Sequence, residues 1–381
     1  MSESKASIGR GFLVLADISG YTAFLSKAEL EHAQEILSDL LETIVGRFKS
    51  LLTIHKIEGD AVFGYTRDAQ LTRGETLLEL LESTYVDFRH RTKNVRRHTS
   101  CGCRACGNIS MLDLKFIVHH GDFAIQSIYG RPELAGSDVN LAHRLLKNHV
   151  SERTGWSAYV LFSKPSLQQA GLTLSGLVDG SEEYEHLGVV ETRALDLHQR
   201  FEALMRSRHV VVEERDALVT FSEVIRATPP VLWSWMNEPE RRAQYSSESH
   251  GMRFIPVLRP EGRTGVGATT HCIHGKNIAM REQVLDWKPF DYYTVQQDSG
   301  AFGMVRTTFQ LEPVDAEHTR LTARLDGRIR PLPEFLSRPL VRLIYGRIFN
   351  YRAVVRKMKE LLEAEAPSAA RRPPLEQGAL A

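Results

Sequence analysis

The stretch GFLVLADISGYT, residues 11–22, decides the fold that is predicted for the first half of the chain. Its first six residues, Gly11 to Ala16, are almost wholly apolar, and so short an apolar run predicts a buried central strand rather than an amphipathic one. Asp17 follows directly. We therefore expect the Asp17 carboxylate at the carboxyl end of a central strand.

The residues after this stretch predict alternating helices and strands. Apolar residues at helical spacing predict two helices within 19–50 and a third within 73–91. Strands are expected at 52–56, 61–65, 112–119, 158–162, 184–187 and 189–195. The order up to residue 119 is then β-α-α-β-β-α-β. The acid-rich residues 179–185 are expected to form a solvated loop.

A second carboxylate is expected beside the first. Gly59 supplies the turn between the strands at 52–56 and 61–65, which places Asp60 in a hairpin. A strand end and a neighbouring hairpin can meet at one point, and Mg²⁺ prefers carboxylate and phosphate oxygens. Asp17 and Asp60 are therefore candidate metal ligands. The other interpretation is that both aspartates serve the backbone, because aspartate is common at strand ends and turns.

Four motifs, in this order, are similar to those of the class III adenylate and guanylate cyclases. They are LADISGYT (15–22), KIEGD (56–60), HHG (119–121) and GSDVNLAHR (136–144). The resemblance spans about Gly11 to Leu146. It implies a ferredoxin-like cyclase domain of α+β class, which converts a nucleoside triphosphate to a 3′,5′-cyclic nucleotide and pyrophosphate.

The resemblance also implies a metal site. Asp17, Asp60 and the backbone carbonyl of Ile18 would hold two Mg²⁺ or Mn²⁺ ions. In the family these ligands come from one subunit and the nucleotide-binding residues from its partner. A homodimer with active sites at its interface is therefore implied.

By the same resemblance, four further residues would bind the nucleotide. Lys56 would donate a hydrogen bond to the purine, and Glu133 would accept one from its exocyclic amine. Asn140 would orient the ribose, and Arg144 would stabilise charge on the transferring phosphate. Asn140 and Arg144 stand four residues apart, so they share one face of a helix.

Glu133 leaves the choice of nucleotide open. Adenylate-selective members of the family usually have Asp at this position, and Glu keeps the acceptor but adds a methylene. ATP is the favoured substrate. Two interpretations of the domain stay open: an active cyclase, and a catalytically inactive cyclase fold that senses a nucleotide or a lipid-like ligand.

A cysteine cluster interrupts the first domain. His98, Cys101, Cys103 and Cys106 provide one imidazole and three thiols within nine residues. Zn²⁺ in a structural site takes Cys and His in this number, whereas the spacing is not among the commonest for zinc. The sequence thus allows a structural zinc site or a loop of reduced thiols.

The second half predicts a different fold. Strands are expected from Val210–Glu214 onward, and a long helix from about Pro339 to Glu363 is expected to close the domain. The segments VLWSWMNEPER (231–241) and VLDWKP (284–289) resemble those of the helix-grip domains related to START proteins and polyketide cyclases. The resemblance implies an antiparallel sheet wrapped on a long C-terminal helix, with an apolar cavity between them.

Aromatic side chains are the candidate lining of that cavity, and ordinary core packing is the other interpretation. They are Trp233, Phe254, Tyr293, Phe302 and Phe309, with His271, His274 and Glu282 as candidate polar groups. The expected partner is a hydrophobic small molecule, and we hypothesise that it regulates the cyclase. A carrier or small-molecule cyclase activity of this domain is the third interpretation.

The length and composition of the chain limit the number of domains and the kinds of partner that we expect. At 381 residues the chain suits two domains, expected at 8–205, with a Cys-rich insertion at 95–110, and at 209–366. Residues 367–381 lack periodicity and are expected to be disordered. The formal net charge of +1 provides no field that would attract nucleic acid. Since no apolar run approaches the roughly 18 residues of a membrane span, we expect a cytoplasmic protein.

Overall fold

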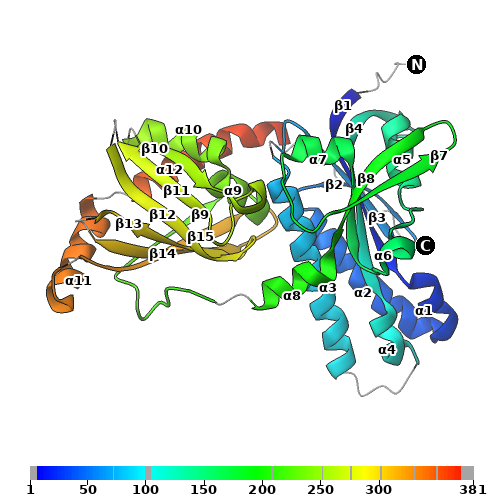
Figure 1. Ribbon diagram of the computed structural model, residues 1–381, viewed down its shortest axis with the longest axis horizontal. Helices are drawn as coiled ribbons and strands as arrows, with labels where there is room; N and C mark the ends of the chain where they lie inside the picture. The colour runs from blue at the N-terminus through cyan, green and yellow to red at the C-terminus, as the bar shows by residue number, and fades with distance from the viewer. Residues whose placement is uncertain are drawn as a thin grey trace. The chain divides into compact units, whose positions relative to one another are not determined.

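The structure, a computed structural model, describes residues 7–71, 73–98, 104–206, 209–250, 252–274, 277–300, 303–329, 331–348 and 351–369. The chain forms two compact units (Figure 1). The first is Met1–Ser207 with Glu261–Arg263, and the second is Arg208–Pro260 with Thr264–Ala381. Each unit combines helices with one sheet, so the predicted α+β class is confirmed.

The first unit is built on an eight-stranded sheet in which β1 (Ser7–Ser19) is a central strand. The strand order is β2-β3-β1-β4-β6-β8-β7, and β5 pairs with β4. Residues 12–16 are fully buried, as their apolar character predicts. The other strands are β2 (Thr53–Glu58), β3 (Ala61–Arg67), β4 (Asp113–Ile128), β5 (Arg131–Ala135), β6 (Tyr159–Ser163), β7 (Val178–Tyr184) and β8 (Gly188–Asp196).

Helices cover both faces of this sheet. Leu13 and Leu15 point toward the face that α5 covers, and they share a core with Val139 of that helix. Phe116 lies on the opposite face, where it packs against Phe48 of α2 with ring centroids 6.1 Å apart. The helices are α1 (Tyr21–Lys27), α2 (Leu30–Phe48), α3 (Glu75–His98), α4 (Arg104–Asn108), α5 (Ser137–Arg144), α6 (Val150–Thr154), α7 (Lys164–Ala170) and α8 (Leu197–Arg206).

The predicted elements up to residue 119 are all present in the predicted order, but a short helix, α4, was not predicted between α3 and β4, and one later strand was misplaced. Residues 184–187 form a turn, in which the Leu187 N–H donates to the Tyr184 carbonyl at 3.1 Å. The acid-rich residues 179–185 belong largely to β7 rather than to a loop. Their Glu182 is buried because His149 and Arg153 pair with its carboxylate at 2.7 and 3.1 Å.

The second unit is a seven-stranded antiparallel sheet with helices packed on it. Its order is β10-β11-β12-β13-β14-β15-β9. The strands are β9 (Val219–Ile225), β10 (Met252–Leu258), β11 (Thr269–His274), β12 (Asn277–Lys288), β13 (Tyr292–Asp298), β14 (Met304–Pro313) and β15 (Thr319–Arg328). The helices are α9 (Pro229–Asn237), α10 (Pro239–His250), α11 (Glu334–Leu343) and α12 (Tyr351–Ala369). The predicted helix-grip fold is confirmed.

Two predictions for this unit were wrong in detail. Residues 210–214 are not a strand, because side chains take up their backbone donors: the Val210 N–H donates to Asp286 at 2.6 Å and the Val212 N–H to Thr308 at 2.8 Å. The long terminal helix is divided into α11, a π-helical turn at Ile344–Ile348 and α12. Pro339 removes a backbone donor inside α11. Since α12 ends at Ala369, the first residues of the predicted tail are helical, and residues 370–381 lie outside the described range.

A buried carboxylate ties α8 to the sheet of the first unit. Asp113 accepts hydrogen bonds from Tyr85 at 3.0 Å and Ser157 at 2.9 Å, and His198 of α8 lies 2.7 Å from it. Burial alone would raise the pKa of Asp113, but His198, Ser157 and Arg89 outweigh it and lower that pKa. The hydrogen bond to Asp113 raises the pKa of His198.

This pair predicts a pH-dependent stability. A histidine whose folded pKa is raised stabilises the fold below its unfolded pKa of about 6.5, and the benefit is lost as pH rises through the folded value. His198→Gln should therefore lower the free energy of unfolding more at about pH 5.5 than at about pH 8.5. Urea denaturation of both proteins at the two pH values measures the difference. An equal loss at both would contradict a charged His198.

Candidate functional site

The two predicted metal ligands lie together at one end of the first sheet. Asp17 pairs with Ala61 in the β1–β3 ladder, and the Ile18 N–H donates to the Asp60 carbonyl at 3.2 Å. The strand end and the hairpin turn are thus joined by the backbone. Burial raises the pKa of Asp60, and the neighbouring Asp17 charge adds to the rise.

Lys115 lies beside these aspartates and was not predicted. It stands opposite Asp17 in the β1–β4 ladder, and its Nζ is 2.9 Å from Asp17 Oδ2. Burial works against the Lys115 charge, but Asp17 outweighs it and raises the lysine pKa. The sequence signal was that Lys115 and Asp113 are charged residues in the otherwise largely apolar stretch LDLKFIVH (112–119).

The donor set at this edge suits a hard divalent cation. The two carboxylates are oxygen donors of the kind that such a cation prefers, and a cation would offset the effects of burial and of the Asp17 charge, which together raise the Asp60 pKa. Among the described residues, no group of three or more His, Cys, Asp and Glu side chains could hold a metal ion. The remaining ligands of a cation here would be substrate oxygens and water.

The two predicted purine-binding residues also lie together. Lys56 of β2 lies with its Nζ 2.7 Å from Oε2 of Glu133, which belongs to β5 and stands opposite Gln126 of β4. His55 Nε2 is 3.4 Å from the same carboxylate oxygen. The hydrogen bond between the pair raises the pKa of Lys56 and lowers that of Glu133. Both groups are therefore charged at neutral pH, so the lysine offers only donors and the glutamate only acceptors.

Asn140 and Arg144 are exposed on α5 and line one open groove. Its volume is about 540 Å³. The groove extends to the turn between β7 and β8, where His186 has a positive φ of 67°. The other lining residues are His143, Lys147, Glu185 and Leu187.

A hydrogen-bond network fixes the start of α5. Asp138 accepts from the Asp122 N–H at 2.7 Å, and His119 Nε2 lies 3.2 Å from its other oxygen. The second ring nitrogen of His119 is 2.7 Å from Ser163 Oγ. A side chain at Gly121 would put its Cβ 2.3 Å from Asp138 Cγ, so the close approach requires glycine there. The HHG motif thus holds the helix that presents Asn140 and Arg144.

Ring contacts link α5 to β2, next to Lys56. Phe63 packs edge-on against His55, with ring centroids 5.5 Å apart, and against His143 of α5 at 4.9 Å. The charged neighbours of Asp60, in contrast, are Asp17 and Lys115. The candidate residues therefore form two groups, one of aspartates with Lys115 and one of Lys56, Glu133 and α5.

The predicted zinc site falls largely outside the description. His98 ends α3 and Cys106 lies in α4, but the structure does not describe their side chains, and Cys101 and Cys103 lie outside the described residues. The zinc site stays a prediction.

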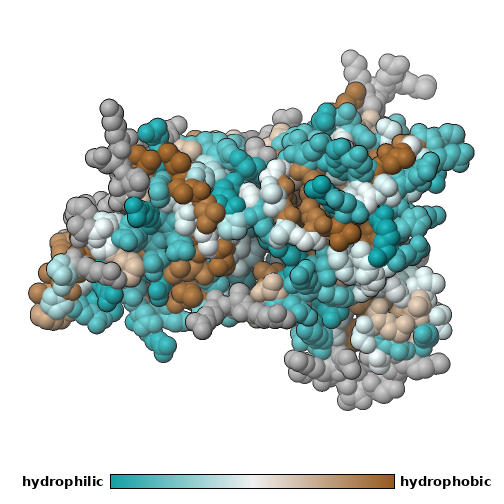
Figure 2. All heavy atoms as spheres, viewed as in Figure 1, coloured by the Kyte–Doolittle hydropathy of each residue, from teal (hydrophilic) through white to brown (hydrophobic). Residues whose placement is uncertain are grey.

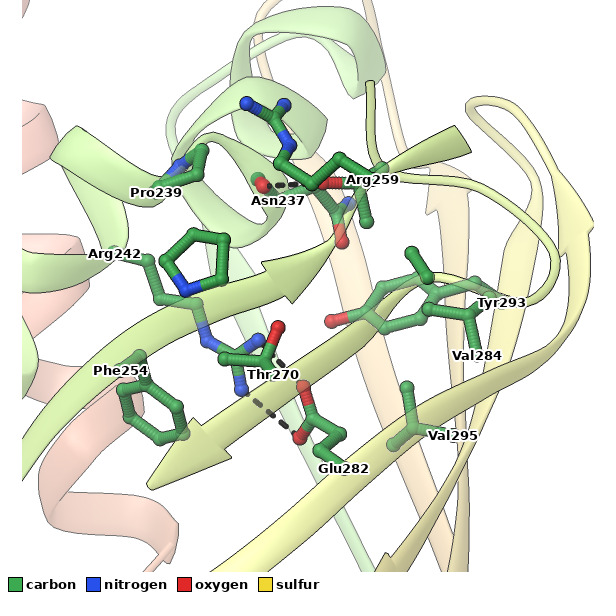
Figure 3. Close-up of a pocket in the computed structure, with 13 residues that line it drawn as sticks. Asn237, Pro239, Arg242, Phe254, Arg259, Thr270, Glu282, Val284, Tyr293 and Val295 are labelled. Atoms are coloured by element: carbon green, nitrogen blue, oxygen red, sulfur yellow. Dashed lines mark hydrogen bonds and ion pairs between the residues drawn. The ribbon is translucent and has the colours of Figure 1, made fainter. Parts of the chain in front are cut away.

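The second unit has a small pocket with a mixed lining, in which a buried ion pair lies among apolar side chains. None of its lining residues belongs to α11 or α12, so the apolar cavity expected beside the long helix stays a prediction. In Figure 3, Arg242 reaches across the pocket to Glu282, with which it makes hydrogen bonds of 2.6 and 3.0 Å. Burial alone would raise the pKa of Glu282, but Arg242 and Gln297 outweigh it and lower that pKa. The open volume is about 20 Å³, room for one water molecule.

The predicted aromatic lining is mostly core. Trp233 packs against Tyr293, and Tyr293 stacks on Phe309 with ring centroids 5.4 and 4.9 Å apart. Phe254 and Tyr293 do line the pocket, and Glu282 is its acidic group. Phe302 and the side chain of His274 lie outside the description.

Comparisons with known proteins match the two units separately. Residues 36–154 match the model of a family described as a protein of unknown function (DUF2652). Residues 216–363, which include every strand from β9 to β15, match the family described as polyketide cyclase / dehydrase and lipid transport. An uncharacterized protein of Mycobacterium tuberculosis is 28% identical over 162 residues, which are 42% of this chain and 73% of that protein.

Solved structures of nucleotidyl cyclases are similar to half of the chain. The adenylyl cyclase CyaB from P. aeruginosa is 15% identical with a TM-score of 0.39, over 50% of this chain and 96% of that one. The guanylyl cyclase Cya2 is 13% identical with the same TM-score, over 50% and 94%. Within the described residues no helix is long and apolar enough to cross a membrane. The second unit thus contains nearly all of the region that matches the polyketide cyclase / dehydrase and lipid transport family.

Proposed function

We propose that the first unit is a metal-dependent nucleotidyl cyclase, which forms a 3′,5′-cyclic nucleotide and pyrophosphate from a nucleoside triphosphate. The observation that carries this proposal is the meeting of Asp17 and Asp60, which lie far apart in sequence, at one end of the sheet. Two adjacent carboxylates of which one has a raised pKa are poised to gain from a cation.

The chain's own residues have separate tasks in this reaction. Asp17, Asp60 and the Ile18 carbonyl would hold the metal, which would supply Lewis-acid stabilisation of the phosphate oxygens and a lower pKa for the ribose 3′-hydroxyl. Asn140 orients the ribose. Arg144 donates hydrogen bonds to the transferring phosphate and stabilises the charge that develops on it. Positioning and electrostatics thus carry the catalysis.

The Lys56–Glu133 pair favours adenine. The Watson–Crick edge of adenine presents an acceptor nitrogen beside an amine donor, and a charged lysine beside a charged glutamate is the complementary pair. ATP is therefore the proposed substrate.

The division of the residues into two groups supports a homodimeric enzyme. Each half of a composite site would come from a different subunit, so a symmetric dimer would contain two sites. A monomer would then hold both groups of residues without a complete site.

Product formation tests the proposal. The purified chain is incubated with Mg²⁺ or Mn²⁺ and each of the four ribonucleoside triphosphates, and cyclic products are quantified by mass spectrometry. We expect cyclic AMP that depends on the metal. Absence of a cyclic product from every nucleotide would contradict the proposal.

Glu133→Ala should weaken selection of the base. The variant loses the acceptor for the adenine amine, so we expect kcat/KM for ATP to fall about 10- to 100-fold while that for the other nucleotides changes less. Steady-state kinetics with each nucleotide measures the ratio. If ATP and GTP lost equal factors, Glu133 would not read the base.

One observation favours a second function. The Lys115 ammonium already neutralises Asp17 at 2.9 Å, which is the charge role that a metal would take. The unit would then bind nucleotide without turnover and serve as a sensor or dimerisation module. Nucleotide affinity that is unchanged by metal chelation, without cyclic product, would favour this function.

A further inference from the structure

Helix α11 turns large apolar side chains toward solvent. It buries only Ser337 and Val341, whereas Phe335 is 74% exposed and Leu336 51% exposed. Leu332, Leu340 and Leu343 nearby are also exposed. Figure 2 shows the resulting apolar surface at the lower left of the molecule. An amphipathic helix that is satisfied by its own sheet would place these side chains inward.

The contacts of α11 hold it in this orientation. Ser337 Oγ accepts a hydrogen bond from the Ile329 N–H at 2.6 Å, and Val341 belongs to a core cluster with Leu325 and Tyr345. The inner face of the helix is therefore occupied. The apolar outer residues cannot reach this core without breaking those contacts, and several large apolar side chains exposed on one helix mark an interaction surface.

The same segment is strongly basic. Between residues 328 and 359 the only acidic residue is Glu334, although the whole chain has a net charge of +1. The basic residues are Arg328, Arg330, Arg338, Arg342, Arg347, Arg352, Arg356, Lys357 and Lys359. Glu334 and Asp326 lie 3.4 and 3.9 Å from Arg338. Glu223 lies 3.1 Å from Lys359 and Glu360 lies 3.9 Å from Lys357, so acidic side chains offset part of this charge. Exposed apolar side chains with basic flanks suit the surface of an anionic bilayer.

We propose that α11 docks the second unit on an anionic lipid surface. Phe335, Leu336, Leu340 and Leu343 enter the boundary between headgroups and acyl chains, and the surrounding arginines contact lipid phosphates. The helix lies in the interface and does not span the bilayer. This surface is independent of the nucleotide chemistry proposed for the first unit.

Co-sedimentation of the full chain with vesicles tests the proposal. One preparation is phosphatidylcholine alone, and the other contains about one quarter phosphatidylserine. We expect binding to the anionic vesicles at least about tenfold tighter than to the neutral ones, with a strong decrease at high salt. No binding to anionic vesicles, or equal binding to both kinds, would overturn the proposal.

Paired variants identify the surface. Phe335→Ser with Leu336→Ser should weaken binding about tenfold or more, because two exposed apolar side chains are lost. Val257→Ser with Leu258→Ser on β10 is the matched control, since these side chains are 56% and 53% exposed, and it should bind as the unchanged protein does. Equal loss in both would overturn the assignment. So would a change of the α11 variant from dimer to monomer with its vesicle binding intact, because α11 would then contact a second copy.

Discussion

Replacing Asp60 by Asn is expected to abolish cyclic nucleotide formation while leaving the fold as stable as before or more so. The amide removes a metal ligand, so turnover should fall about a thousandfold or more. At the same time it removes a half-buried carboxylate whose charge is disfavoured by burial and by Asp17, as its raised pKa indicates. Product assays and urea denaturation of the same preparation measure the two effects.

The matched control is Asp179→Asn. Asp179 is an exposed aspartate that pairs with Arg193 at 2.7 Å, and its replacement should change neither turnover nor the free energy of unfolding by much. If Asp60→Asn lost stability together with activity, Asp60 would be a structural residue and the metal-site interpretation would fail.

Replacing Glu282 by Ala should destabilise the second unit by about 3–5 kcal/mol, because it leaves the Arg242 charge in the pocket without its carboxylate. Gln297, which donates to the same carboxylate at 2.9 Å, also loses its acceptor. Tryptophan fluorescence during urea denaturation reports this unit well, because Trp233, Trp235 and Trp287 all belong to it.

The double variant Arg242→Met with Glu282→Leu shows whether the loss of stability comes from the unpaired Arg242 charge or from lost packing. Removing both charges leaves no unpaired ion, so most of the stability should return. If the double variant were less stable than Glu282→Ala, the pocket would depend on packing at these positions rather than on the ion pair.

Much of the fold was predictable from local patterns. The apolar run at 11–16 and the glycine turn at 59 predicted the central strand and the hairpin beside it, because burial and turn geometry act within a few residues. The strand at 210–214 was predicted wrongly for the complementary reason. Its backbone donors are taken up by Asp286 and Thr308, which are distant in sequence.

The candidate site was predictable only in part. The motifs identified Asp17 and Asp60 as candidate metal ligands, and Lys56 and Glu133 as candidate purine-binding residues. Lys115 and Asp138 were missed, because their importance depends on strand register and on the approach of α5 to Gly121. Neither the strand register nor this approach can be predicted from residues that are neighbours in sequence.

The pocket of the second unit shows the same limit. Trp233, Tyr293 and Phe309 were candidate lining residues of the cavity that the helix-grip resemblance implied, with core packing as the other interpretation, and their rings pack on one another. Arg242 and Glu282 come from α10 and β12, and the sequence alone did not indicate that they would pair.

A mixing experiment tests the central claim that the active site is composite and catalytic. Asp60→Asn disables the group that contains the aspartates and Lys115, and Arg144→Ala disables the group that contains Lys56, Glu133 and α5. Each variant alone should therefore form almost no cyclic AMP. Mixed in equal amounts and allowed to exchange subunits, they should recover about one quarter of the unmodified activity, because half of the dimers would contain one intact site of two. A mixture as inactive as either variant, beside an active unmodified protein, would contradict the composite site.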